Sequence, residues 1–220
     1  MDIGAIGMAG QKKSDVVILG GGLAGLTLSL QLKQRMPELD ITVIERQPHP
    51  VPHATHKVGE SSVEIGAHYF DKILGLKQHL DDAHLKKFGF RFFFSEGSRD
   101  LASVTELGAS MVLPTPSYQL DRGIFENELA NLALQNGIHF VDGAVVRSFD
   151  IAEGQADHEV RYEAGGESHA IQSRWLCDAS GRAGLIKRKL GLAEANNHDV
   201  NAVWFRMSDR IDINECVITP

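Results

Sequence analysis

The chain has 220 residues, with 22 lysines and arginines against 29 aspartates and glutamates, and a net charge of −7. This negative balance argues against a nucleic-acid backbone or an anionic membrane as a partner, and no apolar stretch is long enough to span a bilayer. The cysteines, Cys177 and Cys216, are isolated. They form no redox dithiol or zinc motif and fit a reducing, cytoplasmic setting.

The first predicted elements are a strand, a tight turn, a helix and a second strand. Residues 1–13 are small and polar, and we expect a flexible tail. The β-branched run at 15–19 is typical of a strand buried on both faces of a parallel sheet. Leucines that share one helical face follow over 26–34, and residues 41–44 predict the second strand. This order indicates an α/β, Rossmann-like fold.

The proline-rich loop at 47–57 contains His49, His53 and His56. Their spacing could bind a metal, but no cysteine or carboxylate accompanies them, so no metal site is predicted and the loop is expected near a cofactor.

Later elements follow from the same periodicities. The Phe90–Phe94 cluster is expected to fill the core. The meander is expected at one edge of the sheet. In order, the predicted elements are a helix over 63–80, strands at 90–94 and 117–120, a helix over 124–135 that stops at Gly137, a strand at 138–141, a meander at 145–149, 158–163 and 169–173, a buried strand at 175–178, a helix containing Leu185, Ile186 and Leu190, and a strand over 202–207.

A dinucleotide-binding motif joins the first strand to the first helix. Gly20-Gly21-Gly22-Leu23-Ala24-Gly25 satisfies G-x-G-x-x-G, in which Gly20 makes the turn, Gly22 admits a pyrophosphate and Gly25 lets the helix pack on the strand. Glu45 follows the second strand, where its carboxylate would bind a ribose diol and disfavour NADP. Arg46 and Val146 are assigned to the same site. The alternative is a glycine-rich turn without a ligand.

Three segments carry a resemblance to a known family. Lys57-Val58-Gly59-Glu60-Ser61-Ser62 resembles the V-G-E-[SA] segment of flavin-dependent halogenases, and Tyr118-Gln119-Leu120-Asp121-Arg122 with Phe125-Glu126 resembles a Y-x-[LV]-D-R-x-x-F-[DE] segment. The latter is shared with related aromatic hydroxylases and geranylgeranyl reductases. Asp178-Ala179-Ser180-Gly181 resembles the D-A-[ST]-G turn of this superfamily.

The resemblance implies that FAD is the cofactor of a glutathione-reductase-type domain. It implies FAD contacts by Val58, Gly59, Glu60, Ser61, Arg122, Asp178, Ala179, Ser180 and Gly181. Glu60 could instead be a solvated loop carboxylate, and Asp178 could serve only to cap the next helix.

Lys87 is the predicted catalytic residue. Lys87-Phe88-Gly89-Phe90-Arg91-Phe92 resembles the K-x-G-x-x-F pattern of halogenases that act on phenols and pyrroles, in which the lysine directs or carries the oxidised halide. The alternative is that Lys86 and Lys87 are surface charges at a helix end, like Lys77. Desolvation by nearby phenylalanines would lower the pKa of a catalytic lysine.

The resemblance to halogenases is incomplete. Their W-x-W-x-I-P signature and the Gly-Asp dipeptide of the superfamily are missing from the sequence. We therefore expect a truncated chain, with an FAD-binding domain over 14–200, a substrate-side insertion at about 84–120, and the start of a substrate-side sheet over 201–220.

The expected function is halogenation of an electron-rich small molecule with reduced flavin and O₂. A separate flavin reductase is the expected protein partner, and no oligomeric state is predicted. Hydroxylation, isoprenoid reduction and a non-catalytic FAD-binding module remain the alternatives.

Overall fold

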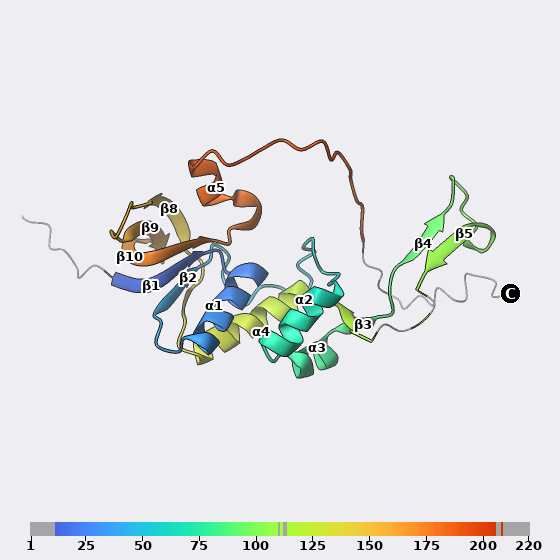
Figure 1. Ribbon diagram of the computed structural model, residues 1–220, viewed down its shortest axis with the longest axis horizontal. Coiled ribbons are helices and arrows are strands. Elements are labelled where there is room, and N and C mark those ends of the chain that lie inside the picture. The colour runs from blue at the N-terminus through green and yellow to red at the C-terminus, as the bar shows by residue number, and fades with distance from the viewer. Residues whose placement is uncertain (1–11, 110, 112–113, 206–207, 209–220) are drawn as a thin grey trace, which may run out of the picture.

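The computed structural model describes residues 12–109, 111, 114–205 and 208. Its centre is a six-stranded sheet of order β7-β2-β1-β10-β9-β8 (Figure 1). The strands are β1 (Lys12–Leu19), β2 (Ile41–Ile44), β7 (His139–Val141), β8 (Val145–Asp150), β9 (His158–Ala164) and β10 (Glu167–Asp178). The first four strands in this order run parallel, whereas β10, β9 and β8 run antiparallel. The predicted Rossmann-like sheet with an edge meander is therefore confirmed.

Two predicted boundaries in the sheet are wrong. Lys12 and Lys13, assigned to the tail, already belong to β1, because they pair with Ile171 and Gln172 of β10. The meander strand predicted at 169–173 and the strand predicted at 175–178 form one continuous strand, β10. Trp175 in this strand is 63% exposed, so the prediction that it is buried also fails.

Helices α1 (Leu23–Arg35) and α4 (Arg122–Gln135) cover one face of the sheet. Leu26 of α1 and Phe125 of α4 are fully buried in the same core cluster as Ile18 of β1. On the other face, a second cluster contains side chains of the curled β8–β10 ribbon and of the short helix α5 (Leu185–Lys189), which follows a 3-10 turn at Gly181–Ala183. Helix α4 ends before Gly137, as predicted.

The segment between β2 and α4 builds the helical end of the molecule. The single helix predicted over 63–80 consists of α2 (Glu64–His68), a π-helical turn (Tyr69–Ile73) and α3 (Lys77–Ala83). Strand β3 (Leu85–Lys87) then pairs antiparallel with β6 (Ser117–Gln119).

A separate hairpin of β4 (Arg91–Phe94) and β5 (Thr105–Gly108), with a 3-10 turn at Leu101–Ser103 between them, projects away from the main sheet (Figure 1). The prediction that its phenylalanines fill the core is wrong: Phe90 is 57% exposed, and Phe92 and Phe94 are each 55% exposed. Phe92 and Phe94 share one face of β4, and because the hairpin lies apart from the helices, no core covers that face.

The chain after α5 runs as an extended segment across the molecule toward the hairpin (Figure 1). Residues 202–205 have no regular structure, so the strand predicted there is not found, and 206–207 lie outside the described residues. In the described part of the chain, no helix is both long and apolar enough to cross a membrane.

Candidate functional site

The glycine turn is closed on two sides and open on a third. Gly20 has a φ of +110°, and a Cβ atom there would lie 2.4 Å from the Ala179 carbonyl oxygen. A Cβ atom on Gly25 would lie 1.9 Å from the Gly20 carbonyl oxygen. On Gly22, by contrast, the nearest atom would be Glu126 Oε1 at 3.9 Å. Strand β10 and helix α1 therefore pack against the turn, while Gly22 faces open space.

Helix α1 begins at this open side, with Leu23 and Ala24 in its first turn. Gly22 is the N-cap, and no described side chain caps the helix. The N–H groups of the first turn and the positive end of the helix dipole are thus directed at the space beside Gly22, as binding of a phosphate requires.

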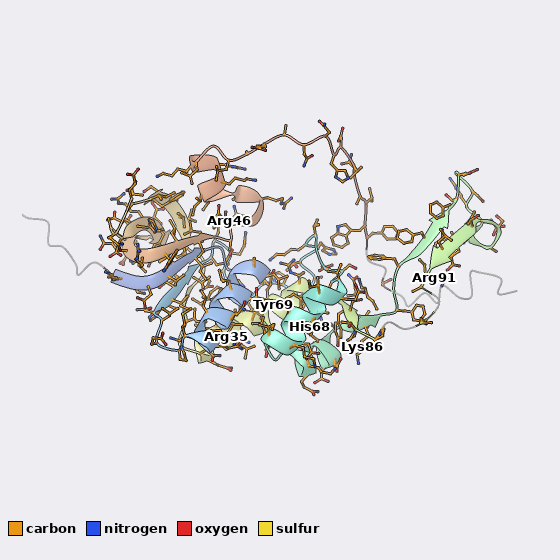
Figure 2. The ribbon with its side chains drawn as sticks, viewed as in Figure 1. Arg35, Arg46, His68, Tyr69, Lys86 and Arg91 are labelled. Atoms are coloured by element: carbon orange, nitrogen blue, oxygen red, sulfur yellow. The ribbon has the colours of Figure 1, made fainter. Side chains whose placement is uncertain are left out.

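A cavity of about 240 Å³, the smaller cavity, lies beside Gly20 of the turn. Its lining contains five residues that the sequence predicts, from separate segments, to bind the cofactor: Gly20, Glu45, Arg46, Val146 and Ser180. Arg46 lies beside the sheet (Figure 2). The size and mixed lining of this cavity suit one end of a dinucleotide.

Glu45 is tied to the turn itself. Its Oε2 accepts a hydrogen bond from the Gly21 N–H at 2.6 Å, and its Oε1 accepts one from the Gln47 N–H at 2.7 Å. A carboxylate oxygen can accept more than one hydrogen bond, so Glu45 can both brace the turn and bind a ribose hydroxyl.

The predicted D-A-S-G residues lie at the end of β10, next to the glycine turn. The Ala179 N–H donates to the Leu19 carbonyl at 2.9 Å. Asp178 accepts hydrogen bonds from the Ser180 N–H at 3.1 Å and from the Ile186 N–H of α5 at 2.8 Å. Burial raises the pKa of Asp178, but a hydrogen bond from the Ser180 hydroxyl, together with these backbone bonds, outweighs it and leaves the pKa lowered. Asp178 thus has the capping geometry of the alternative interpretation. Gly181 lies near Ala24 in a separate surface hollow.

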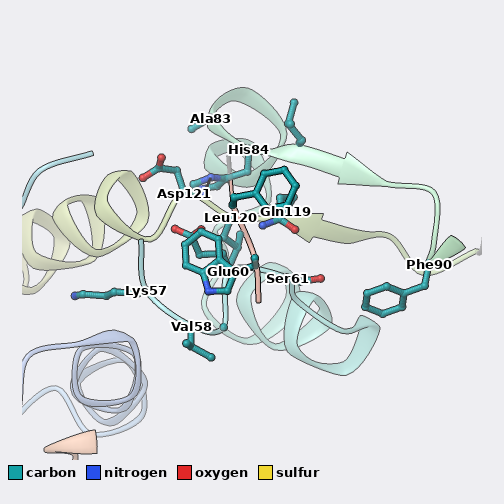
Figure 3. A pocket seen from close by; sticks show the side chains of 14 residues that line it. Lys57, Val58, Glu60, Ser61, Ala83, His84, Phe90, Gln119, Leu120 and Asp121 are labelled. Carbon is teal, nitrogen blue, oxygen red and sulfur yellow. Dashed lines mark hydrogen bonds between the residues drawn. The ribbon is translucent and has the colours of Figure 1, made fainter. Parts of the chain in front are cut away.

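A larger cavity of about 700 Å³ lies at the helical end of the molecule (Figure 3). Its lining combines the predicted segment Val58–Ser61 with the residues at and just after the end of β6. The full set is Lys57, Val58, Gly59, Glu60, Ser61, Ala83, His84, Leu85, Phe90, Gln119, Leu120, Asp121, Trp204 and Phe205. Glu60 is only 5% exposed, and its Oε1 accepts a hydrogen bond from the Arg122 N–H at 3.4 Å. Glu60 is therefore not a solvated loop carboxylate.

His84 in this lining was not singled out from the sequence. Its Nδ1 accepts a hydrogen bond from the Asp121 N–H at 3.1 Å, at the start of α4. Burial, and to a lesser extent His79, lower the pKa of His84 to about 4, which makes it neutral at pH 7.

An ion cluster of Lys57, Arg122 and Glu126 borders the larger cavity, which Lys57 lines, and lies next to Gly22. Glu126 is 1% exposed; it accepts a hydrogen bond from Arg122 Nε at 3.0 Å and pairs with Lys57 Nζ. Only Arg122 was predicted as a site residue. Lys57 and Glu126 were missed because their contact joins positions far apart in the chain. A signal for Glu126 was present, since it is the acidic residue of the F-[DE] segment quoted above.

Lys87 lines a third cavity of about 430 Å³, the lysine cavity, together with Val63, Phe90, Phe92 and Leu107. Its Nζ donates to Ser61 Oγ at 2.7 Å and to the Ser62 carbonyl at 2.6 Å, and lies 4.7 Å from the centre of the Phe90 ring. Burial lowers the pKa of Lys87, partly opposed by Glu64. The predicted cofactor residue Ser61 therefore contacts the lysine directly.

The neighbouring lysines differ from Lys87. Lys86 pairs with Asp81 at 3.0 Å on the outer surface (Figure 2). Lys77 pairs with Asp81 at 2.6 Å, and its side chain is also exposed. Lys86 and Lys87 lie on strand β3 rather than at a helix end, so that part of the sequence interpretation is wrong.

The histidine loop shows no metal-binding geometry. Among the residues that the structure describes, no group of three or more His, Cys, Asp or Glu side chains could hold a metal ion. Instead, the ring of His56 stacks on Trp204 with their centres 5.7 Å apart.

The fold and the glycine turn define a dinucleotide-binding α/β protein. Residues 13–218 match the FAD-binding domain family, and the chain belongs to this family. The prediction of FAD as the cofactor is thereby confirmed.

Known halogenases are among the similar proteins. The chain is 28% identical to "Flavin-dependent halogenase chlA" of Dictyostelium discoideum, over 76% of this chain and 31% of that protein. It is also 28% identical to a 1H-pyrrole-2-carbonyl-[peptidyl-carrier protein] brominase of Pseudoalteromonas luteoviolacea (strain 2ta16), over 81% and 40%. The solved structure of CmlS, a flavin-dependent halogenase, matches with a TM-score of 0.64 and 27% identity, over 83% and 32%. The chain thus spans less than half the length of these relatives.

Proposed function

We propose that this chain is the FAD-binding part of a flavin-dependent halogenase that acts on an electron-rich small molecule. One observation carries the proposal: Ser61, from the segment proposed to contact the flavin, holds the Lys87 amine against an aromatic cavity. The names of the relatives support the same activity. Because they are much longer than this chain, the activity is proposed for the complete protein.

We place the FAD pyrophosphate beside Gly22, on the N–H groups of Leu23, Ala24 and Gly25. The open space at Gly22 and the uncapped helix support this position. The adenosine end would then occupy the smaller cavity, where Glu45 accepts hydrogen bonds from the ribose and Arg46, Val146 and Ser180 form the walls. Asp178, Ala179 and Gly181 would close the site from the end of β10.

The flavin end would extend past Arg122 to the larger cavity, along Val58–Ser61. Glu60 lies at this end and accepts a hydrogen bond from the backbone N–H of Arg122. The Arg122 side chain points instead to Glu126, on the pyrophosphate side. A planar ring system requires a concave and largely apolar lining of this type. The lysine cavity lies on the other side of Ser61, which separates the proposed cofactor from the proposed substrate.

When bound and reduced, FAD would supply two electrons and two protons. Together with O₂, a halide ion and one further proton, these would convert an aromatic C–H bond into a C–halogen bond, with release of two water molecules. Lys87 holds the oxidised halogen against the substrate carbon, by hydrogen bonding as an ammonium or by binding it as an amine. Its lowered pKa increases the fraction of free amine. A flavin reductase as electron donor and a cytoplasmic location are part of the same proposal.

The test starts with the visible spectrum of the purified chain, where the absorption bands of oxidised flavin are expected. The complete protein is then supplied with a flavin reductase, NADH and chloride or bromide, and products are identified by mass spectrometry. A halogenated aromatic product supports the proposal. A hydroxylated product or a reduced isoprenoid would instead establish one of the alternative reactions, and flavin binding without turnover would indicate a binding module.

A further inference from the structure

We infer that Glu126 is a positioning residue of the cofactor site, which holds Lys57 and Arg122 beside Gly22 and sets the charge that meets the FAD pyrophosphate. The inference rests on the proposed position of the pyrophosphate. Glu126 contacts no reacting atom, and it acts through the two cations.

The three residues come from two distant segments and meet at one point. Lys57 belongs to the loop before the V-G-E-S segment, whereas Arg122 and Glu126 lie one helical turn apart on α4. Arg122 Nε lies 3.0 Å from Glu126 Oε1, and Lys57 Nζ pairs with Glu126 Oε2. Arg122 Nη1 also donates to the Val58 carbonyl at 3.3 Å, so the cluster ties α4 to the predicted flavin segment.

Burial shows which member is the anchor. The Glu126 side chain is 1% exposed, the Arg122 side chain 12% and the Lys57 side chain 38%. The carboxylate is therefore enclosed, whereas both cations retain contact with solvent. Glu126 Oε1 nevertheless lies only 3.9 Å from the position of a Cβ atom on Gly22, so the cluster borders the open side of the glycine turn.

Stability alone does not account for such a cluster. A buried ion pair contributes little net stability, because desolvation offsets the attraction, and apolar residues of similar size would serve as well. A buried carboxylate without partners would also repel a pyrophosphate. With two cations fixed around it, the cluster carries a net charge of +1 and presents N–H donors to the same space.

Two roles of Glu126 predict opposite effects of its neutralisation. If Glu126 is only a negative charge near the ligand, Glu126→Gln will strengthen FAD binding. If it positions the cations, Glu126→Gln will weaken FAD binding. Glutamine keeps one acceptor oxygen for two cations, turns an NH2 donor toward the other cation, and lacks the charge that offsets their mutual repulsion. The structure favours the second outcome, since both cations converge on this one carboxylate.

The experiment measures the affinity of the 220-residue chain for FAD and for riboflavin by fluorescence titration. Riboflavin contains the same ring system and lacks the pyrophosphate. We expect Glu126→Gln to weaken FAD binding about tenfold, as for a lost charge-assisted contact, and to leave riboflavin binding unchanged. Glu128→Gln removes the same charge two residues further along α4 and should match the wild type. The double variant Lys57→Met/Glu126→Gln should lose less FAD affinity than the product of the fold-losses of the two single variants.

Equal or tighter FAD binding by Glu126→Gln overturns the inference, and so does an equal loss for riboflavin. Thermal unfolding shows whether the variant is folded. If it is not, Lys57→Met and Lys57→Arg replace it, because this side chain is partly exposed. Weaker FAD binding by Lys57→Met than by Lys57→Arg then supports the inference. The same FAD affinity in the two variants overturns it. A wild-type chain that binds no FAD overturns the proposed function, and this inference with it.

Discussion

Replacement of Gly22 by valine should abolish FAD binding and leave the fold intact. Gly22 has a φ of −80° and a ψ of −170°, which a valine adopts without strain. Its side chain would point into open space, since the nearest atom to the Cβ position is Glu126 Oε1 at 3.9 Å. That space is where we place the pyrophosphate.

The magnitude follows from the contacts that valine would block. A hydrogen bond to a charged group contributes about 1.5 to 3 kcal/mol. If valine keeps the phosphate from two N–H groups of α1, FAD binding weakens by about 3 to 6 kcal/mol, which is at least a hundredfold. The free energy of unfolding should fall by no more than about 1 kcal/mol, the difference between glycine and a poor N-cap residue.

The assay combines an FAD titration with urea unfolding of the chain without FAD. Gly25→Ala is the matched control, because its Cβ would lie 1.9 Å from the Gly20 carbonyl oxygen. This control should lower the free energy of unfolding by about 1 to 3 kcal/mol or more, as overpacking does. A Gly22→Val chain that binds FAD with wild-type affinity would show that the pyrophosphate lies elsewhere.

Three further predictions concern Glu45, Lys87 and His84. Glu45→Ala should weaken FAD binding by about 1 to 3 kcal/mol through the lost ribose contact, measured by titration; unchanged affinity would place the ribose elsewhere. In the complete protein, Lys87→Ala should retain FAD binding and hydrogen peroxide release but form no halogenated product by mass spectrometry, whereas Lys86→Ala and Lys77→Ala should match the wild type. Comparable halogenation by Lys87→Ala would favour the hydroxylase or reductase alternative. Burial lowers the pKa of His84 from 6.5 to about 4, so the unfolded chain binds a proton that the folded chain does not. The contribution of the neutral, buried His84 to the free energy of unfolding is therefore fully present above about pH 6.5. As the pH falls toward 4, the free energy of unfolding should decrease by on the order of 3 kcal/mol. Urea unfolding should show a smaller fall for His84→Asn, and an equal fall would assign the effect to other groups.

The first βαβ unit could be predicted because its signals are local. The apolar run ending at Leu19, the three glycines and the leucine spacing of α1 each specify a conformation over a few residues, and the structure has all of them. Glu45 was selected as a candidate in the same way, from its position after β2. The smaller cavity is the spatial result of these local signals.

Non-local contacts set the limit of sequence reasoning. The alternation of residues along the predicted strand could not show that Phe92 lies on a projecting hairpin. The period of two residues is the same whether an apolar face packs on the core or is exposed. The pairing of Lys57 with Glu126 depends on how α4 packs against a loop far away in the sequence. The position of Lys87 on a strand likewise depends on pairing with Ser117 of β6.

The parallel pairing of β1 with β10 has a consequence for synthesis on the ribosome. The wall of the glycine turn that Ala179 provides lies about 160 residues after Gly20 in the chain. At roughly 5 to 20 residues per second, about 10 to 30 seconds pass between the synthesis of Gly20 and the synthesis of Ala179. During that interval one edge of β1 has no partner from β10. A nascent chain is therefore expected to acquire FAD only after Ala179 leaves the exit tunnel, and chaperones that shield exposed strands would act on it before then.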